Sequence, residues 1–145
     1  MRLQDKNAIE RAKGLWQQAS FINKLGIELE DIKPGETRSR LQVKDWQGQA
    51  EGYVHAGVIA TMADHSCGCA GGTLVRADEI VLTIEFKVNL LRPATGEALI
   101  CFARVIKPGK TIIVCEAEVF SQKRQREKLV AKTIVTLAVV ADPQK

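Results

Sequence analysis

The chain has 145 residues, of which 46% are hydrophobic and 26% are charged, and it carries a formal net charge of +4. This length suits one domain with a sizeable core, and the composition is that of an ordinary soluble globular protein. The charge is too small to indicate nucleic-acid binding by itself, and the sequence has neither an apolar run long enough to cross a membrane nor the apolar core of an N-terminal signal peptide.

Residues 4–19 predict an amphipathic helix, and a short helical turn is expected at 21–25. We expect the helix to pack against the rest of the domain. A DNA-binding helix-turn-helix would need a second helix, for which the chain leaves no room before its first strand. The apolar stripe of the predicted helix consists of Ala8, Ala12, Leu15, Trp16 and Ala19.

Alternating residues at 27–32 and 37–43 predict two strands. A turn at 33–36, which contains Pro34 and Gly35, joins them into a hairpin. Residues 44–54 are expected to form a loop.

Residues 55–72 predict one long helix with a face of small or apolar side chains, which would let another helix approach closely. Gly71 and Gly72 are expected to end the helix, because glycine readily takes the left-handed conformation found at helix ends. The residues of the small face are Ile59, Met62, Ala63, Ser66, Cys67 and Ala70.

A single carboxylate, Asp64, is expected on this face, seven residues after Gly57. Seven residues are close to two turns, so both residues point the same way, about 10.5 Å apart at ~1.5 Å per residue. Free amides at the helix start could hold a carbonyl oxygen that becomes negative in a transition state, and Asp64 could activate water or attack directly. One helix cannot bring both groups to one carbonyl, whereas two antiparallel copies related by a two-fold axis could. The alternative is a core helix whose single Asp faces solvent.

The second half of the chain contains four strand patterns, at 80–91, 97–106, 111–120 and 129–140. A turn at 107–110 and a charged segment at 121–128 separate the later ones. Long strands joined by short turns predict an antiparallel meander.

The four cysteines do not have the spacing of a disulfide or zinc framework. Cys67 and Cys69 are two residues apart on the predicted helix and point to different faces, while Cys101 and Cys115 lie inside strand patterns. We therefore expect free buried thiols, no metal site and a reducing, cytoplasmic location.

The motif His55-Ala56-Gly57, with Asp64 two turns later, resembles the central helix of the PaaI-like (phenylacetate-degradation type) hotdog-fold acyl-CoA thioesterases. Residues 81–94 resemble the strand after that helix, and 106–111 resemble the next turn, so the similarity covers roughly residues 20–140. The resemblance implies an α+β hotdog fold, in which a curved antiparallel sheet wraps one long helix. It implies one hotdog domain over 21–141 and a homodimer or homotetramer with shared active sites. The amphipathic pattern adds a helix in the N-terminal segment 1–20, before this domain.

The same resemblance implies roles for five residues. Asp64 would be the general base or the nucleophile, and the Gly57 amide would polarise the thioester carbonyl. Thr83 would lie near the attacking water, or it is simply a β-branched strand residue. Gln49 stands where the family usually has a positioning Asn, or it is an ordinary surface glutamine. His55 is more typical of a residue that fixes the helix start than of a catalytic base.

Basic residues in the turns suit the phosphates of coenzyme A, although any one of them could be a solvated hairpin end. They are not interleaved with aromatic residues, which disfavours nucleic acid as a partner. The candidate CoA-binding residues are Arg92, Lys107, Lys110, Lys123 and Arg124.

These features together predict an acyl-CoA thioesterase that needs no cofactor, since coenzyme A is part of its substrate. One alternative is a non-catalytic hotdog module that binds acyl-CoA or acyl chains as a sensor or scaffold. A hotdog hydratase would need an Asp and a His several residues apart, and Asp64 and His65 are adjacent, so their side chains diverge by roughly 100° on a helix.

Overall fold

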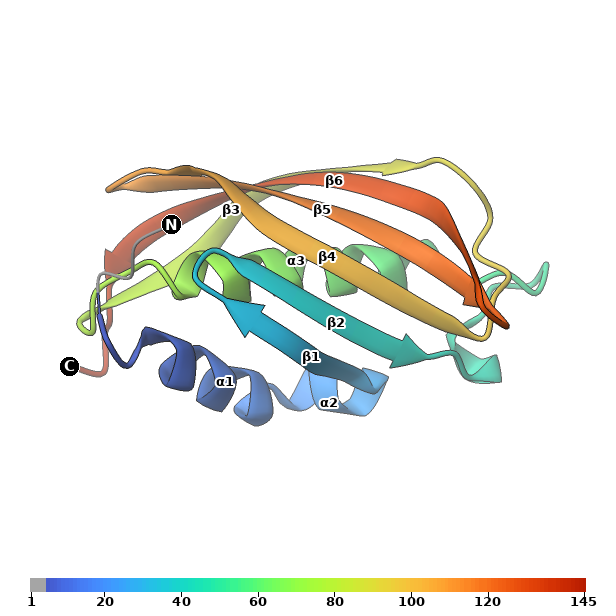
Figure 1. Cartoon of the computed structure of the whole chain (residues 1–145), viewed down its shortest axis with the longest axis horizontal. Helices are drawn as coiled ribbons and strands as arrows, with labels where there is room; N and C mark the ends of the chain where they lie inside the picture. Colours follow the sequence, from blue (N-terminus) through green and yellow to red (C-terminus); the bar gives the residue numbers. More distant parts are fainter. Residues whose placement is uncertain (1–4) are drawn as a thin grey trace.

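The computed structural model describes residues 5–145, which form three α-helices and a six-stranded antiparallel sheet (Figure 1). The sheet curves around the longest helix, and the two N-terminal helices pack beside that helix and the first strand. This arrangement confirms the expected α+β hotdog fold with an N-terminal helix. The elements are α1 (Ala8–Gln18), α2 (Ser20–Leu25), β1 (Ile27–Lys33), β2 (Glu36–Gln42), α3 (Ala56–Gly72), β3 (Glu79–Leu90), β4 (Ala98–Pro108), β5 (Ile112–Lys123) and β6 (Arg126–Ala141).

The strands are ordered β1-β2-β4-β5-β6-β3 across the sheet. β4, β5 and β6 form the expected meander, but β3 does not lead into it. β3 pairs with β6 at one edge, and the chain then crosses to place β4 beside β2. The prediction of a four-strand meander was therefore wrong for β3, which is an edge strand.

The N-terminal segment matches its prediction with two differences. Of the predicted range 4–19, residue 4 lies outside the described residues, as do 1–3. The helix is interrupted at Ala19, whose ψ of 88° is not helical, and α2 follows. Ala8, Ala12 and Trp16 are buried as expected, whereas Leu15 is 57% exposed.

The buried face of α3 consists of the expected small and apolar residues, and it packs against the sheet rather than against another helix. Two contacts anchor it: the hydroxyls of Ser39 and Ser66 lie 2.8 Å apart, and Thr37 Oγ1 donates to the Ser66 carbonyl at 2.9 Å. Asp64 is not on this buried face. Because each residue turns the helix by about 100°, it lies on the adjacent, half-exposed face.

The end of α3 also differs from its prediction. Gly71 and Gly72 are both helical, and the helix is capped by Thr73 in a right-handed conformation, φ −71°. Gly71 instead packs closely against the sheet, and a Cβ there would lie 2.5 Å from Leu137 Cδ1, so that this side chain would have to shift. The expectation that glycine ends this helix through a left-handed turn was wrong.

The charged segment at 121–128 is not a separate connection. It forms the last residues of β5 and the first of β6, joined by a tight turn in which Arg124 has a φ of 57°. We call this turn, residues 123–126, the basic hairpin tip.

All four cysteines are free; Cys67, Cys101 and Cys115 are buried, and Cys69 is half-buried. Within residues 5–145, no group of His, Cys, Asp or Glu side chains is arranged to hold a metal ion. None of the helices in the described part of the chain is long and apolar enough to span a membrane.

Candidate active site

The N-terminus of α3 is fixed by His55. This residue has an extended backbone at the N-cap position, and its Nδ1 accepts a 2.8 Å hydrogen bond from the Gly57 amide. The neutral imidazole that accepts at Nδ1 carries its proton on Nε2. The interpretation of His55 as a residue that fixes the helix start agrees with this geometry, and the Gly57 amide is already bonded within the chain.

The loop before α3 is held by Gln47, a residue that sequence reasoning missed. Its side chain is buried, donates to the Leu25 carbonyl at 2.7 Å and accepts from the Lys44 amide at 2.8 Å. The Gln47 carbonyl also accepts from the His55 amide at 2.9 Å, which ties the loop to the helix start. A single buried glutamine in an irregular loop has no periodic signal that would reveal it. The predicted Gln49, two residues later, is exposed.

Asp64 and Thr83 are brought together from different elements. Thr83 Oγ1, on β3, donates a 2.7 Å hydrogen bond to Asp64 Oδ1 on α3. The β3–β6 register shifts between Thr83 and Glu85, an irregularity of the kind that re-aims side chains near functional sites. Burial raises the pKa of the Asp64 carboxyl above its ordinary value, while the Thr83 hydroxyl lowers it. A half-buried carboxylate of raised basicity is suited to accepting a proton.

Gly57 and Asp64 share the half-exposed face of α3 but do not meet. Seven residues separate them, which is about 10.5 Å along the helix. The groups that could polarise a carbonyl and activate water are therefore too far apart within one chain to act on the same atom. A site that uses both needs a second copy.

A cavity of ≈ 550 Å³ adjoins Asp64, and it lies between α1, α3 and the start of β3. Its walls are mostly apolar, and its volume is within the range of small-molecule sites. Sequence reasoning did not find this cavity, because α1 comes from the far end of the chain. The residues that line it include Ala12, Leu15, Trp16, Gly68, Gly72 and Val81.

His65 belongs to the wall of this cavity and not to a catalytic pair. Its ring packs edge-on against Trp16, with centroids 4.4 Å apart, and burial lowers its pKa to about 4. Nε2 of His65 is buried without a hydrogen-bond partner. The imidazole is therefore neutral at physiological pH, and the structure gives no support to an Asp64–His65 dyad.

The five candidate CoA-binding residues fall into two groups at opposite ends of the sheet. Thr83 pairs with Leu137, which pairs with Ile113, so the turn that carries Lys107 and Lys110 lies at the Asp64 end. In β6, Leu137 comes eleven residues after the basic hairpin tip. At ~3.4 Å per residue, the tip is therefore roughly 37 Å from Leu137 along the strand. Lys123 and Arg124 belong to this tip. Arg92, which donates to the Leu129 carbonyl at 3.0 Å, lies at the same end.

The start of α3 lies at the end of the sheet that carries the basic hairpin tip. The Val54 amide, just before α3, donates to the Ala94 carbonyl at 3.0 Å. Two residues further on, the Gly96 amide donates to Ser121 Oγ at 2.7 Å, near the end of β5. The Gly57 end of α3 and the basic hairpin tip are thus neighbours, whereas the Asp64 end faces the cavity.

Comparison with known proteins gives one family match and several relatives. The family described as "Thioesterase superfamily" matches residues 51–128. The 1,4-dihydroxy-2-naphthoyl-CoA hydrolase of Listeria monocytogenes is 29% identical over 115 residues, covering 79% of this chain and 91% of the relative. The medium/long-chain acyl-CoA thioesterase YigI of Escherichia coli is 27% identical over 122 residues, covering 72% of this chain and 77% of the relative. The crystal structure of a thioesterase family protein from Silicibacter pomeroyi has a TM-score of 0.90 at 30% identity and covers 92% of this chain and 98% of its own.

Proposed function

The chain belongs to the thioesterase superfamily, and from this premise we propose that it hydrolyses acyl-CoA thioesters to a free acid and coenzyme A. The observation that carries the proposal is the Thr83–Asp64 hydrogen bond beside an apolar cavity. The two relatives with acyl-CoA names support a CoA thioester as the substrate. Their acyl groups differ, so the names alone do not assign one to this chain.

Asp64 is the proposed catalytic group. As a general base it takes a proton from water while the water oxygen bonds to the thioester carbonyl carbon; the C–S bond then breaks and coenzyme A leaves as the thiolate, which is protonated. As a nucleophile it attacks the same carbon, the C–S bond breaks and coenzyme A leaves as the thiolate, which is protonated; water then hydrolyses the resulting anhydride to the free acid and the Asp64 carboxylate. Thr83 holds one carboxylate oxygen, which leaves the other free for either role.

The Gly57 amide is the proposed donor to the carbonyl oxygen. In the free chain this amide is bonded to His55 Nδ1, so the substrate oxygen has to replace the imidazole. A donor of this kind contributes ~3 kcal/mol to transition-state stabilisation. His55 then acts as a positioning residue that keeps the amide oriented until substrate arrives. Gln49 is exposed at the same end of α3 and is proposed to contact the substrate from there.

The second copy is proposed to join at β3. This strand is at the sheet edge, and residues 82–87 are exposed throughout, so both of its faces are uncovered. Leu82, Ile84 and Phe86 are 53%, 58% and 47% exposed, and an apolar, unprotected edge of this length favours pairing with another strand. Because Thr83 contacts Asp64, a second β3 paired antiparallel would also bring the two α3 helices side by side. Gly57 of one protomer would then approach Asp64 of the other.

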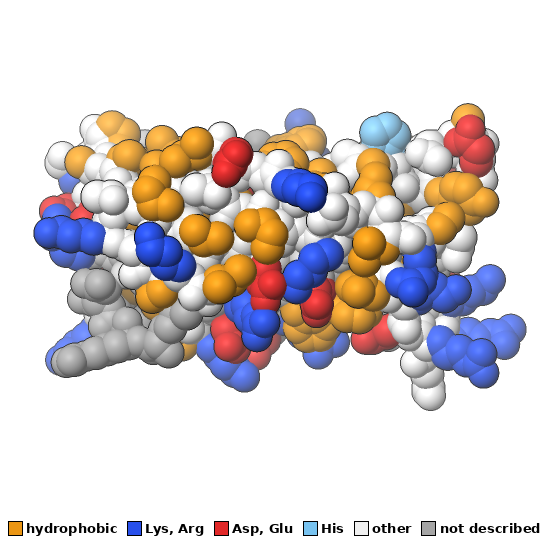
Figure 2. Space-filling model, turned by 90° about the horizontal axis from the view of Figure 1, so that it is seen from above, with side chains coloured by type: hydrophobic (Ala, Val, Ile, Leu, Met, Phe, Trp, Pro, Cys, Tyr) orange, Lys and Arg blue, Asp and Glu red, His pale blue; other side chains and the backbone are white. Residues whose placement is uncertain are grey.

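A homotetramer requires a further contact surface, for which the outer face of the sheet is the candidate. Figure 2 shows hydrophobic side chains interspersed with charged ones on this face. Phe102 and Ile134 are 40% and 38% exposed there, beside the ion pairs that Lys132 makes with Glu116 and Glu118. A surface with both charges and apolar groups is compatible with contact to a second dimer. A measurement of the number of protomers in solution tests this proposal.

The nucleotide of coenzyme A is proposed to lie toward the basic hairpin tip of the protomer that supplies Gly57. The start of α3 and this tip are at the same end of the fold. In a shared site, the acyl group would enter the cavity of the protomer that supplies Asp64, and the CoA arm would leave in the opposite direction. Lys107 and Lys110 are at the cavity end of their own chain and are the weaker candidates.

Hydrolysis of an acyl-CoA panel, followed with a thiol reagent, tests the proposal. We expect turnover of at least one thioester by the wild type and its loss in Asp64→Asn. The competing function is an acyl-CoA sensor or scaffold. Calorimetric binding of acyl-CoA by the wild type without release of free thiol would support the sensor and reject the thioesterase.

A further inference from the structure

Two glycines in α3 are not explained by the packing of the protein. A Cβ added at Gly68 or at Gly72 would have no heavy atom within 4 Å, in contrast to Gly71, where it would meet Leu137 at 2.5 Å. Glycine inside a helix is destabilising relative to alanine, and Gly68 lies inside α3, whereas Gly72 is its last residue. Alanine would fit at both positions, so packing within the protein does not explain why glycine is found there.

Both glycines line the cavity that begins at Asp64. Asp64, Gly68 and Gly72 are spaced four residues apart, so they follow one another along a single face of α3. Trp16 of α1 and Val81 of β3 are among the residues that wall the cavity on its other sides. The α3 wall therefore contains a strip formed by the two glycines, bordered by His65 and Cys69, that leads from the carboxylate toward the end of the helix.

We propose that this strip is the bed of a straight, medium-length acyl chain, an assignment that rests on the proposed function. From Asp64 to Gly72 the helix rises ~12 Å, the length of an extended chain of about eight to ten carbons when C–C bonds of about 1.5 Å zigzag. The thioester carbonyl lies at Asp64, and the methyl end lies over Gly72. Gly68 and Gly72 are the residues that determine the length of the chain.

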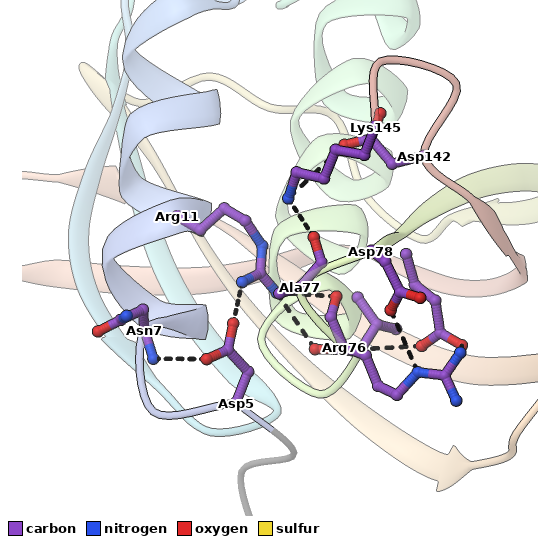
Figure 3. Close-up of polar contacts among 10 residues, drawn as sticks. Asp5, Asn7, Arg11, Arg76, Ala77, Asp78, Asp142 and Lys145 are labelled. Carbon is purple, nitrogen blue, oxygen red and sulfur yellow. Dashed lines mark hydrogen bonds and ion pairs between the residues drawn. The ribbon is translucent and has the colours of Figure 1, made fainter.

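Beyond the end of α3, polar groups of the N-terminal segment, the loop after α3 and the C-terminal residues form hydrogen bonds and ion pairs (Figure 3). Arg11 Nη2 lies 3.2 Å from both the Val75 and the Arg76 carbonyls, immediately after α3, and Arg11 also pairs with Asp5. The side chain of Lys145 donates to the Ala77 carbonyl in the same region. Arg11 and Lys145, together with Glu79 and Asp142, line the end of the cavity. A longer chain would have to displace these hydrogen-bonded and charged groups, which sets an upper limit to its length.

The test compares Gly72→Leu and Gly68→Leu with the wild type on straight-chain substrates from butanoyl-CoA to hexadecanoyl-CoA. We expect a wild-type optimum near octanoyl- or decanoyl-CoA. Gly72→Leu should lower the ratio of decanoyl to butanoyl kcat/KM at least tenfold, because each excluded methylene costs about fourfold. Gly68→Leu, closer to Asp64, should move the optimum to shorter chains still.

Gly14→Leu is the matched control. Gly14 is also a helical glycine with no heavy atom within 4 Å of an added Cβ, but it does not line the cavity. This variant should keep the wild-type chain-length profile. An unchanged decanoyl-to-butanoyl ratio in Gly72→Leu, or an equal loss on both substrates, would overturn the assignment.

Binding separates this inference from the proposed function. In an Asp64→Asn background, decanoyl-CoA should bind at least tenfold more tightly than butanoyl-CoA by calorimetry, and Gly72→Leu should remove the difference. If the chain binds medium-length acyl-CoA in this way but the wild type hydrolyses none, the thioesterase proposal fails and the acyl bed stands. If it hydrolyses acyl-CoA without regard to Gly72, the acyl bed fails and the thioesterase stands.

Discussion

Thr83 Oγ1 donates a 2.7 Å hydrogen bond to Asp64 Oδ1, and this contact joins the edge strand β3 to the central helix α3 at the mouth of the apolar cavity. Burial raises the pKa of Asp64, and the Thr83 hydroxyl opposes that rise. The carboxylate is thereby partly desolvated while one of its oxygens accepts a hydrogen bond that favours its charged form. Two predictions follow from changing either member of this pair.

Asp64→Asn should lower kcat by about 10²–10⁴-fold, the usual contribution of a positioned general base. The variant should also be slightly more stable at neutral pH. A raised pKa in the folded state means that the charged form is disfavoured there, so the stability penalty is present above the folded pKa and disappears as Asp64 is protonated. Thermal melts at pH 7 and at acid pH, alongside thioester assays, measure both effects. Near wild-type turnover in a folded Asp64→Asn protein would remove Asp64 from the mechanism.

Thr83→Val should move the acidic limb of the kcat/KM profile to higher pH. The hydroxyl stabilises the ionised carboxylate, so its removal raises the pKa of Asp64 further and the base is protonated at a higher pH. Thr83→Ser keeps the hydroxyl and serves as the control, with a profile like that of the wild type. A profile that keeps its acidic limb in Thr83→Val would show that the limb does not report on Asp64.

Mixing two inactive variants tests the shared site. Asp64→Ala removes the base, and Gly57→Pro removes the amide hydrogen within the first turn of the helix, where proline is tolerated. Each homodimer should be inactive. If equal amounts exchange freely, half of the dimers are hybrids with one intact site of two, so about a quarter of the wild-type activity should return. If no activity returns in a mixture shown to contain hybrid dimers, the whole site lies within one chain.

His65 gives a prediction about stability alone. Burial lowers its pKa from 6.5 to about 4, so the folded state disfavours the charged ring. The stability that neutral His65 contributes is complete above pH 6.5 and is lost as the pH falls toward 4, by up to about 3 kcal/mol. His65→Phe keeps an aromatic ring against Trp16. In this variant, the free energy of unfolding measured with urea should change less with pH between 6.5 and 4. An equally steep decline in the variant would assign the pH dependence to other groups.

Much of the fold could be predicted because its signals are local. The face of α3 that contains Met62 and Cys67 is buried as its periodicity indicates, and each of the six predicted strands is present. The position of β3 beside β6 could not be predicted, since strand patterns carry no information on which distant strand they pair with. The Asp64–Thr83 contact could not be predicted for the same reason; the family resemblance placed Thr83 only near the attacking water.

The cavity and its glycine strip show the limit of sequence reasoning more clearly. Gly72 was interpreted as a helix stop, because glycine at the end of a helical pattern usually has that role. Whether a glycine ends a helix, avoids a collision or leaves space for a ligand depends on what lies opposite it. For Gly71 that is Leu137, and for Gly68 and Gly72 it is open space beneath α1. Only the three-dimensional arrangement separates these cases.

The basic residues provide the final prediction. Lys123→Gln combined with Arg124→Asn should raise KM for acyl-CoA several-fold with little change in kcat, because contacts remote from the reacting carbonyl act equally on ground and transition states. Asparagine is chosen at Arg124 because its φ of 57° is left-handed, a conformation that asparagine tolerates. The defect should shrink as salt rises, since exposed charges are screened over about 8 Å at physiological ionic strength.

The matched comparison is the double variant of Lys107 and Lys110, at the opposite end of the sheet, which we expect to change KM little. N-acetylcysteamine thioesters lack the nucleotide phosphates, so they should be hydrolysed equally well by the wild type and by both double variants. Steady-state kinetics at low and high salt provide the measurement. If the Lys107 and Lys110 variant shows the larger, salt-dependent rise in KM, the CoA arm runs toward the cavity end of the fold, and the proposed direction of the substrate across the two protomers is reversed.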